Sequence, residues 1–199
     1  KFQRFWRKFR MNCIIIHGSN PKDKEKIKRG VPTQNKRNWL SWLKGKLEEK
    51  GIKTDTPLMP KNESPLYEDW KNEIENLFVD ENTILVGQSA GGGFLVRWLG
   101  ENEIKIKKLI LVAPAIVHNE EYSYLEKMLK FKINKNIKNN TGEIVIFVSD
   151  DEREGIKKSV KILHEHLGGK LIELKGKGHF TMKYSIEKAF PELLKEVLE

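Results

Sequence analysis

Residues 84–92 read ILVGQSAGG, and this stretch decides the fold. The apolar run at its start predicts a buried strand, and the residues from Ala90 onwards predict a helix. Between them stands Gly87-Gln88-Ser89-Ala90-Gly91, in which the two glycines let neighbouring backbone approach closely. A serine on such a sharp turn holds its hydroxyl exposed above the sheet. We therefore predict that Ser89 is a nucleophile; a P-loop would need a Lys-Ser or Lys-Thr end, which is absent here.

Short β-branched runs alternate with longer helical patterns on both sides of this stretch, which predicts βαβ units and a parallel sheet. The strands are predicted at Cys13–Ile16, Ile52–Thr54, Thr83–Val86, Lys108–Val112, Glu143–Val148 and Lys170–Leu174. The helices are predicted at Asn38–Lys50, Pro65–Phe78, Ala90–Leu99, Ile156–Leu167 and Ile186–Leu198. The expected fold class is α/β: a three-layer sandwich with a mostly parallel six-stranded sheet and helices on both faces. The less regular residues 115–142 are expected to form an excursion over the carboxyl ends of the strands, or else one crossover helix at Glu121–Phe131 with a solvated tail.

The composition is typical of one soluble globular domain. Of the 199 residues, 38% are hydrophobic and 33% are charged, and no apolar run approaches the ~20 residues that span a bilayer. The one cysteine, Cys13, rules out an intramolecular disulfide, so a cytoplasmic location is expected. We expect a single domain over residues 11–199.

The formal net charge of +9 is unevenly distributed. Residues 1–10 carry five basic groups and no acid, which leaves +4 for the rest of the chain. We interpret residues 1–10 as a basic N-terminal extension that need not be native, with a membrane-surface or nucleic-acid arm as the alternative. Because +4 is ordinary for a soluble enzyme, no nucleic-acid partner and no membrane span are expected.

A histidine activates Ser89 only if the fold brings both residues to the same end of the sheet. His179 follows the last predicted strand, so it is expected at the carboxyl ends of the strands, as Ser89 is. It also comes after a candidate acid, which is the order Ser, Asp or Glu, and His along the chain. Asp150, Asp151 and Glu152 follow the preceding strand, and a carboxylate there would fix the imidazole tautomer.

Backbone donors for a developing oxyanion are predicted at two places. The sequence His17-Gly18-Ser19-Asn20 follows the first strand, and a tight turn there presents a backbone N–H at Ser19 or Asn20. The second donor is the N–H of Ala90 at the start of the helix. His17 itself is expected to be structural. The histidines and aspartates lack metal-ligand spacing, and neither a metal nor another cofactor is expected.

Together these motifs resemble the α/β-hydrolase superfamily. The resemblance is carried by His17-Gly18, residues 87–92, Asp150-Asp151 and Gly178-His179-Phe180. More narrowly, the chain resembles small lidless serine hydrolases of the retinoblastoma-binding protein 9 type, to which Met59-Pro60 followed by Trp70 adds. The resemblance runs from about residue 12 to the C-terminus. It implies a minimal α/β-hydrolase fold, a Ser-His-Asp triad and hydrolysis of small esters or amides.

The resemblance points to two different acids. Matching the family's aspartate doublet selects Asp151, whereas counting back from His179 without a gap selects Glu152. We predict Asp151, because a one-residue insertion in an exposed loop costs little and an aspartate is the usual partner. Asp150 is expected instead to shape the turn by bonding local backbone amides.

The sequence therefore predicts a carboxylesterase-like serine hydrolase that cleaves small esters, with amides as a second class, through an acyl-enzyme on Ser89. The alternative is a non-catalytic interaction module that keeps the hydrolase fold and binds a protein or an acidic partner. A third hypothesis is nonspecific nucleic-acid or membrane binding through residues 1–10 and the lysines at 22–29. The intact Ser89 and His179 favour the enzyme. The chain leaves little material for a cap domain, so short acyl groups are expected as substrates.

Overall fold

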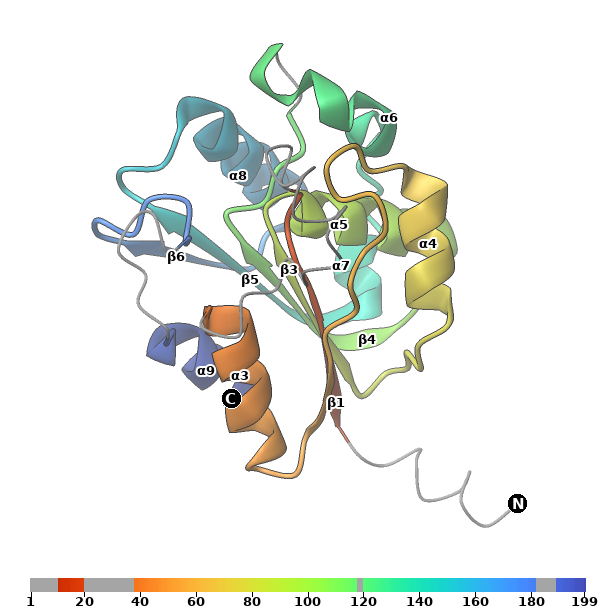
Figure 1. Ribbon diagram of the computed structural model, residues 1–199, viewed down its shortest axis with the longest axis vertical. Coiled ribbons are helices and arrows are strands. Elements are labelled where there is room, and N and C mark those ends of the chain that lie inside the picture. The colour runs from red at the N-terminus through yellow and green to blue at the C-terminus, as the bar shows by residue number, and fades with distance from the viewer. Residues whose placement is uncertain (1–10, 20–37, 118–119, 182–188) are drawn as a thin grey trace, which may run out of the picture.

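The computed structural model describes residues 11–19, 38–117, 120–181 and 189–199. It contains a six-stranded sheet in the order β2-β1-β3-β4-β5-β6, and every neighbouring pair of strands is parallel (Figure 1). This sheet confirms the predicted α/β fold class. The strands are β1 (Asn12–Ile16), β2 (Lys53–Asp55), β3 (Thr83–Gln88), β4 (Ile106–Val112), β5 (Thr141–Ser149) and β6 (Lys170–Leu174).

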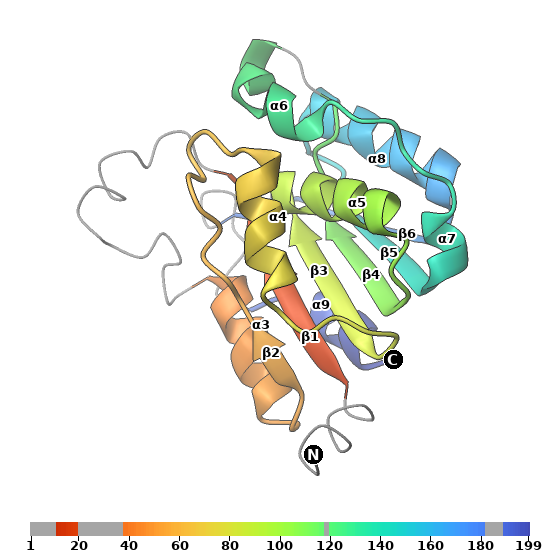
Figure 2. The same cartoon turned by 90° about the vertical axis from the view of Figure 1, so that its right-hand side faces the viewer.

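Helices cover both faces of the sheet, so the domain has the three expected layers (Figures 1 and 2). On one face α3 (Trp39–Glu48) packs beside α9 (Pro191–Leu198). The other face is covered by α4 (Tyr67–Glu75), α5 (Ala90–Asn102) and α8 (Glu154–Leu167). The predicted helix Ile186–Leu198 begins outside the described residues, and α9 is its described part.

The central strands contain continuous apolar runs because helices bury both of their faces. The side chains of residues 84–86 in β3 and 109–112 in β4 are all fully buried. The strand β3 runs two residues beyond its predicted end, because Gly87 and Gln88 still pair with Leu111 and Val112 of β4. The nucleophile candidate therefore follows the last paired residue of β3 directly.

The segment between β4 and β5 forms three short helices, and the predicted single crossover helix Glu121–Phe131 is wrong. They are η1 (Glu120–Leu125), α6 (Glu126–Leu129) and α7 (Ile137–Asn140). The first two lie beyond the carboxyl ends of the strands, at the top of Figure 1, as expected for an excursion. A contact from another helix holds them: the guanidinium of Arg97 in α5 donates to the carbonyls of Lys127 and Met128, each at 3.1 Å.

Within the described residues, none of the helices combines the length and the apolar character that crossing a bilayer requires. Residues 1–10 and the lysine-rich residues 22–29 lie outside the described part of the chain. The predictions made for them stay predictions.

Candidate active site

Ser89 stands on the strained turn that the motif predicts. Its backbone has φ 50° and ψ −120°, a left-handed conformation that non-glycine residues rarely adopt. The end of β4 and the residues after it hold this turn in place. The Ser89 N–H donates to the carbonyl of Val112 at 2.9 Å, and the Ser89 carbonyl accepts from the N–H of Ala115 at 3.0 Å. The turn projects Ser89 from the end of the sheet, directly before α5.

The two glycines of the motif are required by backbone packing. A Cβ on Gly87 would lie 2.7 Å from the Cα of Gly92, and one on Gly91 would lie 2.6 Å from the carbonyl oxygen of His17. Both obstacles are backbone atoms, which cannot move aside as a side chain can. The motif therefore packs β3 and α5 closely against each other and against the end of β1.

Replacing Gly91 with alanine is expected to destabilise the fold by about 1–3 kcal/mol, because the added methyl group overpacks a site closed by backbone. The measurement is the free energy of unfolding in urea. Gly45 in the middle of α3 is the matched control, since a Cβ there meets nothing within 4 Å. The Gly45→Ala variant is expected to be as stable as the natural chain or slightly more so. A Gly91→Ala variant with unchanged stability would contradict the packing argument.

His179 lies between Ser89 and a carboxylate. Its Nε2 is 2.9 Å from the Oγ of Ser89, and its Nδ1 is 2.7 Å from Oε2 of Glu152. The side chain of Glu152 is 1% exposed and that of His179 is 13% exposed, so water has little access to this pair. The other carboxylate oxygen, Oε1, accepts from the backbone N–H of Arg153 at 2.8 Å. Three side chains that are far apart in sequence thus form one continuous hydrogen-bonded line.

The prediction that Asp151 is the partner of His179 is wrong: Glu152 occupies that place. The strand β5 ends at Ser149, and the N–H of Glu152 then donates to the carbonyl of Ser149 at 3.2 Å. This tight turn directs Glu152 towards the imidazole and Asp151 towards the loop before His179. The gap-free count along the chain therefore selects the residue that contacts His179 in the structure.

Asp151 has a different set of partners. It accepts from the hydroxyl of Ser149 and, at 2.8 Å, from the N–H of Gly178. These hydrogen bonds, that of Ser149 first, favour the charged carboxylate and lower the pKa of Asp151 below its ordinary value. The Asp151 carboxylate therefore supports the loop before His179 (residues 176–178), called the histidine loop below.

Three successive residues at the end of β5 bind three successive amides of the loop 176–178. Asp150 accepts from the N–H of Gly176, Ser149 Oγ from that of Lys177 and Asp151 from that of Gly178, each at 2.8 Å. Asp150 was expected to bond local backbone amides, whereas its carboxylate accepts from Gly176 in the loop before His179. Ser149 was not predicted, because nothing in its local sequence marks it. Together the three hydrogen bonds fix the chain immediately before His179.

The chain immediately after His179 is fixed as well. The carbonyl of Phe180 accepts from Nε1 of Trp39 at 2.9 Å and from Nε2 of Gln88 at 3.1 Å. The ring of Phe180 is fully buried and stacks on Phe190, with ring centroids 5.3 Å apart. Gln88 precedes the nucleophile, so this bond ties the serine turn directly to the histidine loop. The helical pattern predicts only a core or groove-wall position for Trp39, and its polar role had no sequence signal.

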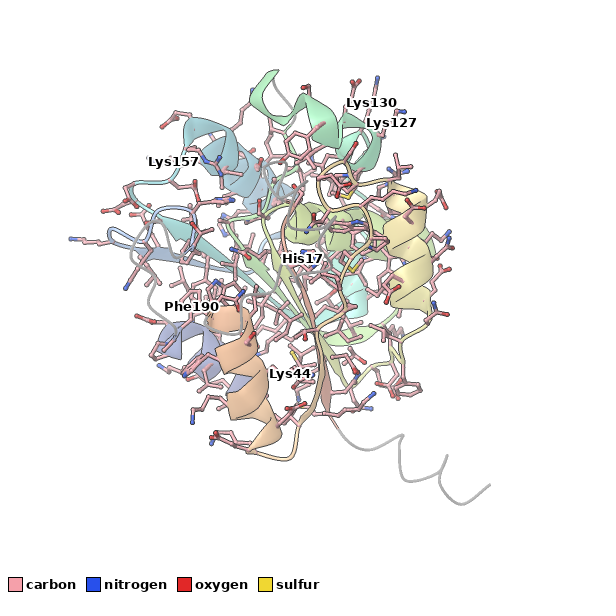
Figure 3. All side chains as sticks on the ribbon, viewed as in Figure 1. His17, Lys44, Lys127, Lys130, Lys157 and Phe190 are labelled. Atoms are coloured by element: carbon pink, nitrogen blue, oxygen red, sulfur yellow. The ribbon has the colours of Figure 1, made fainter. Side chains whose placement is uncertain are left out.

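His17 has the structural role that was expected. Its side chain is buried, and Figure 3 labels it near the centre of the view. Its Nδ1–H donates to the carbonyl of Gly18 at 2.7 Å and its Nε2 accepts from the N–H of Met59 at 3.0 Å, which is the neutral tautomer. Burial lowers the pKa of His17 and keeps the ring uncharged. The ring orients the turn after β1, where a Cβ on Gly18 would lie only 3.1 Å from Cβ of Ser89.

Two of the three predicted oxyanion donors lie among the described residues. The N–H of Ala90 is the first amide of α5 and has no hydrogen-bond partner within the described part of the chain. Ser19 lies just beyond Gly18, and its Oγ is 3.0 Å from the hydroxyl of Tyr124 in η1. Asn20 lies outside the described residues. The Ser19 contact places the excursion after β4 beside the candidate site.

Comparisons with known proteins show the family and the fold of the chain. The chain matches the serine hydrolase family over residues 27–196. It is 27% identical to YdeN of Bacillus subtilis (strain 168) over 161 residues, which cover 77% of this chain and 84% of YdeN. The crystal structure of the ydeN gene product superposes with a TM-score of 0.79 at 20% identity, covering 94% of this chain and 97% of that one. Est1E from Butyrivibrio proteoclasticus superposes with a TM-score of 0.62 at 17% identity, covering 95% and 87%.

The two structural likenesses show the shared α/β-hydrolase fold alone. The narrower resemblance to the retinoblastoma-binding protein 9 type stays a prediction. The family match covers most of the chain and includes the nucleophile turn, the carboxylate and the histidine. The protein therefore belongs to the serine hydrolase family.

Proposed function

We propose that the protein is a serine esterase that cleaves small esters through an acyl-enzyme on Ser89. The observation that carries the proposal is the line from Ser89 Oγ through His179 to Glu152, with contacts of 2.9 and 2.7 Å. A serine hydroxyl is a weak nucleophile until a base removes its proton, and His179 stands within hydrogen-bond reach of that proton. The triad proposed is thus Ser-His-Glu rather than Ser-His-Asp.

In the first step the Oγ of Ser89 attacks the ester carbonyl carbon while His179 Nε2 takes its proton. The Nδ1–H of His179 donates to Glu152 throughout, and the carboxylate stabilises the imidazolium that forms. The oxyanion of the tetrahedral intermediate accepts from the N–H of Ala90 and from a backbone N–H at Ser19 or Asn20. The imidazolium then protonates the leaving alkoxide, and the alcohol departs.

In the second step water attacks the acyl-enzyme, with His179 again as the base. The second tetrahedral intermediate collapses, the proton returns to Ser89 and a carboxylic acid is released. Every proton transfer in this scheme uses side chains of the chain itself. Glu152 is well placed for both steps, because its Oε1 is bound by Arg153 N–H and its Oε2 by His179.

The direct test is labelling with a fluorophosphonate probe, which reacts with an activated serine and needs no knowledge of the natural substrate. The natural chain is expected to take up one equivalent, with the added mass on the peptide that contains Ser89. A Ser89→Ala variant is the control and is expected to stay unlabelled. A natural chain that stays unlabelled would contradict the esterase and favour the non-catalytic interaction module.

Substrates with short acyl groups are expected to react best. The excursion over the carboxyl ends of the strands consists of the short helices η1 and α6, and Tyr124 of η1 lies against Ser19. Such a cover leaves a shallow site. The measurement is kcat/KM along a series of p-nitrophenyl esters from acetate to decanoate. A clear preference for decanoate over acetate and butyrate would show that the site is deep.

A further inference from the structure

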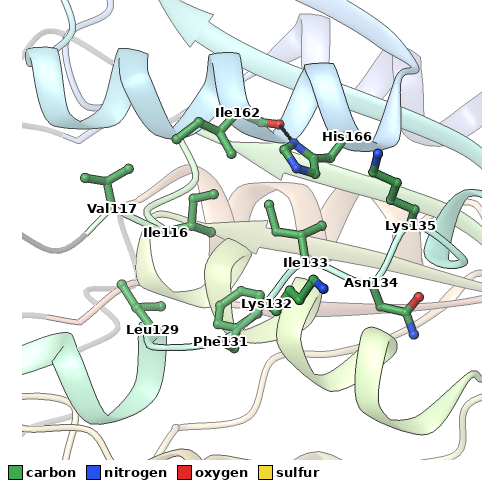
Figure 4. Close-up of a pocket in the computed structure, with 10 residues that line it drawn as sticks. All are labelled: Ile116, Val117, Leu129, Phe131, Lys132, Ile133, Asn134, Lys135, Ile162 and His166. Carbon is green, nitrogen blue, oxygen red and sulfur yellow. Dashed lines mark hydrogen bonds between the residues drawn. The ribbon is translucent and has the colours of Figure 1, made fainter.

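A cavity of about 820 Å³ lies between α8, the residues that follow β4 and the chain that joins α6 to α7 (Figure 4). Its volume is in the range of pockets that hold small molecules, roughly 300–1,000 Å³. Neither Ser89 nor His179 lines it, so it is separate from the candidate active site. Nothing in the proposed mechanism uses this cavity.

The wall of the cavity is apolar at one end and cationic at the other. Figure 4 shows Ile116, Val117 and Leu129 at one end, and Lys135, Asn134 and His166 at the opposite end. Phe131, Ile133 and Ile162 extend the apolar surface between them, and Lys132 adds a second ammonium group. The cavity therefore offers an apolar surface and a positive charge to the same ligand.

The positive charges are available to a ligand. Among the described residues, no carboxylate lines the cavity, and neither Lys132 nor Lys135 forms an ion pair. The Nδ1 of His166 lies 2.9 Å from the carbonyl of Ile162, so this ring is held in place at the wall of the cavity. The amide of Asn134 donates to the carbonyl of Gly100 at 2.8 Å, so its side chain is held in a fixed position.

We propose that this cavity binds a monocarboxylate with an apolar body, such as a medium-chain or aryl carboxylic acid. The carboxylate lies beside the ammonium groups of Lys132 and Lys135, and the apolar body lies on Ile116, Val117 and Leu129. Two ammonium groups on long side chains, without a guanidinium fork or a cradle of backbone amides, suit a singly charged head better than a phosphate. This proposal stands independently of the proposed esterase activity.

The apolar end of the cavity is built on the segment that supports the nucleophile turn. The N–H groups of Ile116 and Val117 both donate to Ser159 Oγ at 3.1 Å, and the preceding residue, Ala115, donates to the carbonyl of Ser89. A ligand bound at the apolar end packs against Ile116 and Val117, which directly follow the residue that contacts Ser89. Its binding site is thus fixed by the same rigid framework as the active site.

The test is isothermal titration calorimetry of the full chain with sodium octanoate, sodium acetate and 1-octanol. Octanoate is expected to bind saturably with one equivalent, 1-octanol to bind more weakly, and acetate to give no saturable signal. The double variant Lys132→Gln/Lys135→Gln is expected to bind octanoate roughly tenfold more weakly and 1-octanol unchanged, since each exposed charge contributes modestly. The matched control is Lys138→Gln/Lys161→Gln, which removes two exposed charges outside the cavity and is expected to bind octanoate normally.

A second variant tests the apolar wall. Ile162→Glu places a carboxylate in the cavity on a half-buried position of α8, and it is expected to abolish octanoate binding while circular dichroism shows a folded protein. Octanoate binding that survives both Ile162→Glu and the lysine double variant would overturn the proposal. So would the absence of any saturable octanoate binding to the natural chain. A chain whose Ser89 is blocked by the fluorophosphonate is expected to bind octanoate as before, and loss of binding there would place the ligand at Ser89 and overturn the assignment to this cavity.

Discussion

A chain in which Ser89 is replaced by alanine is expected to hydrolyse p-nitrophenyl acetate with a kcat about 10⁶-fold below that of the natural chain. The substitution removes the only atom that forms the acyl-enzyme, while His179, Glu152 and the Ala90 N–H stay in place. Members of a triad act as a unit, so the loss of the nucleophile costs nearly all of the rate that the triad supplies. The measurement is the initial rate at saturating ester.

The fold of the Ser89→Ala variant is expected to be unchanged. Alanine keeps the Cβ, and the two backbone hydrogen bonds of residue 89, to Val112 and from Ala115, do not involve the hydroxyl. Thermal unfolding checks this point. Ser41→Ala, a serine in α3 on the other face of the sheet, is the matched control and is expected to keep full activity. Hydrolysis at an undiminished rate in the Ser89→Ala variant would refute the mechanism.

The second large effect is expected at Glu152. Replacing it with glutamine keeps the size of the side chain but removes the charge that fixes the Nδ1–H tautomer of His179, which costs roughly 10⁴ in kcat when the equivalent change is made in a serine protease triad. The glutamine amide can also donate to Nδ1, and that arrangement would place the proton on Nε2, where it blocks removal of the serine proton. We therefore expect nearly complete loss of turnover with little change in thermal stability.

Comparing Glu152→Gln with Asp151→Asn distinguishes two roles: the carboxylate that contacts His179 and the carboxylate that positions the loop before it. An asparagine oxygen can still accept from the N–H of Gly178, so this variant keeps the contact that positions the loop. Its kcat is expected to fall far less than that of Glu152→Gln, and Asp150→Asn is expected to change least because its one bond is at the exposed end of the loop. A larger loss in Asp151→Asn than in Glu152→Gln would reverse the assignment.

The prediction of Asp151 gave the aspartate doublet more weight than the spacing to His179, and the position of the strand end shows why the spacing was the better guide. The strand before it was predicted to end at Val148, whereas β5 continues through Ser149. The direction of each side chain in the following turn depends on where the turn begins, so a shift of one residue exchanges the roles of Asp151 and Glu152. The end of β5 is set by its pairing with β6, which the local sequence around residue 149 does not reveal. The spacing to His179 does carry that information, because the whole structure between the two residues has to fit it.

The sheet itself could be predicted because its signal is local. Runs such as residues 109–112 are apolar throughout, and every predicted strand is present with its ends moved by no more than two residues. The segment after β4 could not be predicted in the same way. Its sequence mixes lysines, which favour a helix, with asparagines, which do not. Contacts from elsewhere, such as those of Arg97 in α5, hold α6 in place. A prediction from local sequence patterns cannot include such contacts, because they join residues that are far apart in the chain.

Because the Trp39 indole donates a hydrogen bond to the carbonyl of Phe180, the fluorescence emission of Trp39 reports the position of the histidine loop. The emission of an indole depends on its hydrogen bonds and on the polarity around it, and Phe180 directly follows His179. The difference between the emission spectra of the natural chain and a Trp39→Phe variant isolates this one indole from the other four tryptophans. Undocking of the loop would shift that difference spectrum to longer wavelength. The position of the base can thus be followed optically in a chain that performs no reaction, including one that lacks the nucleophile.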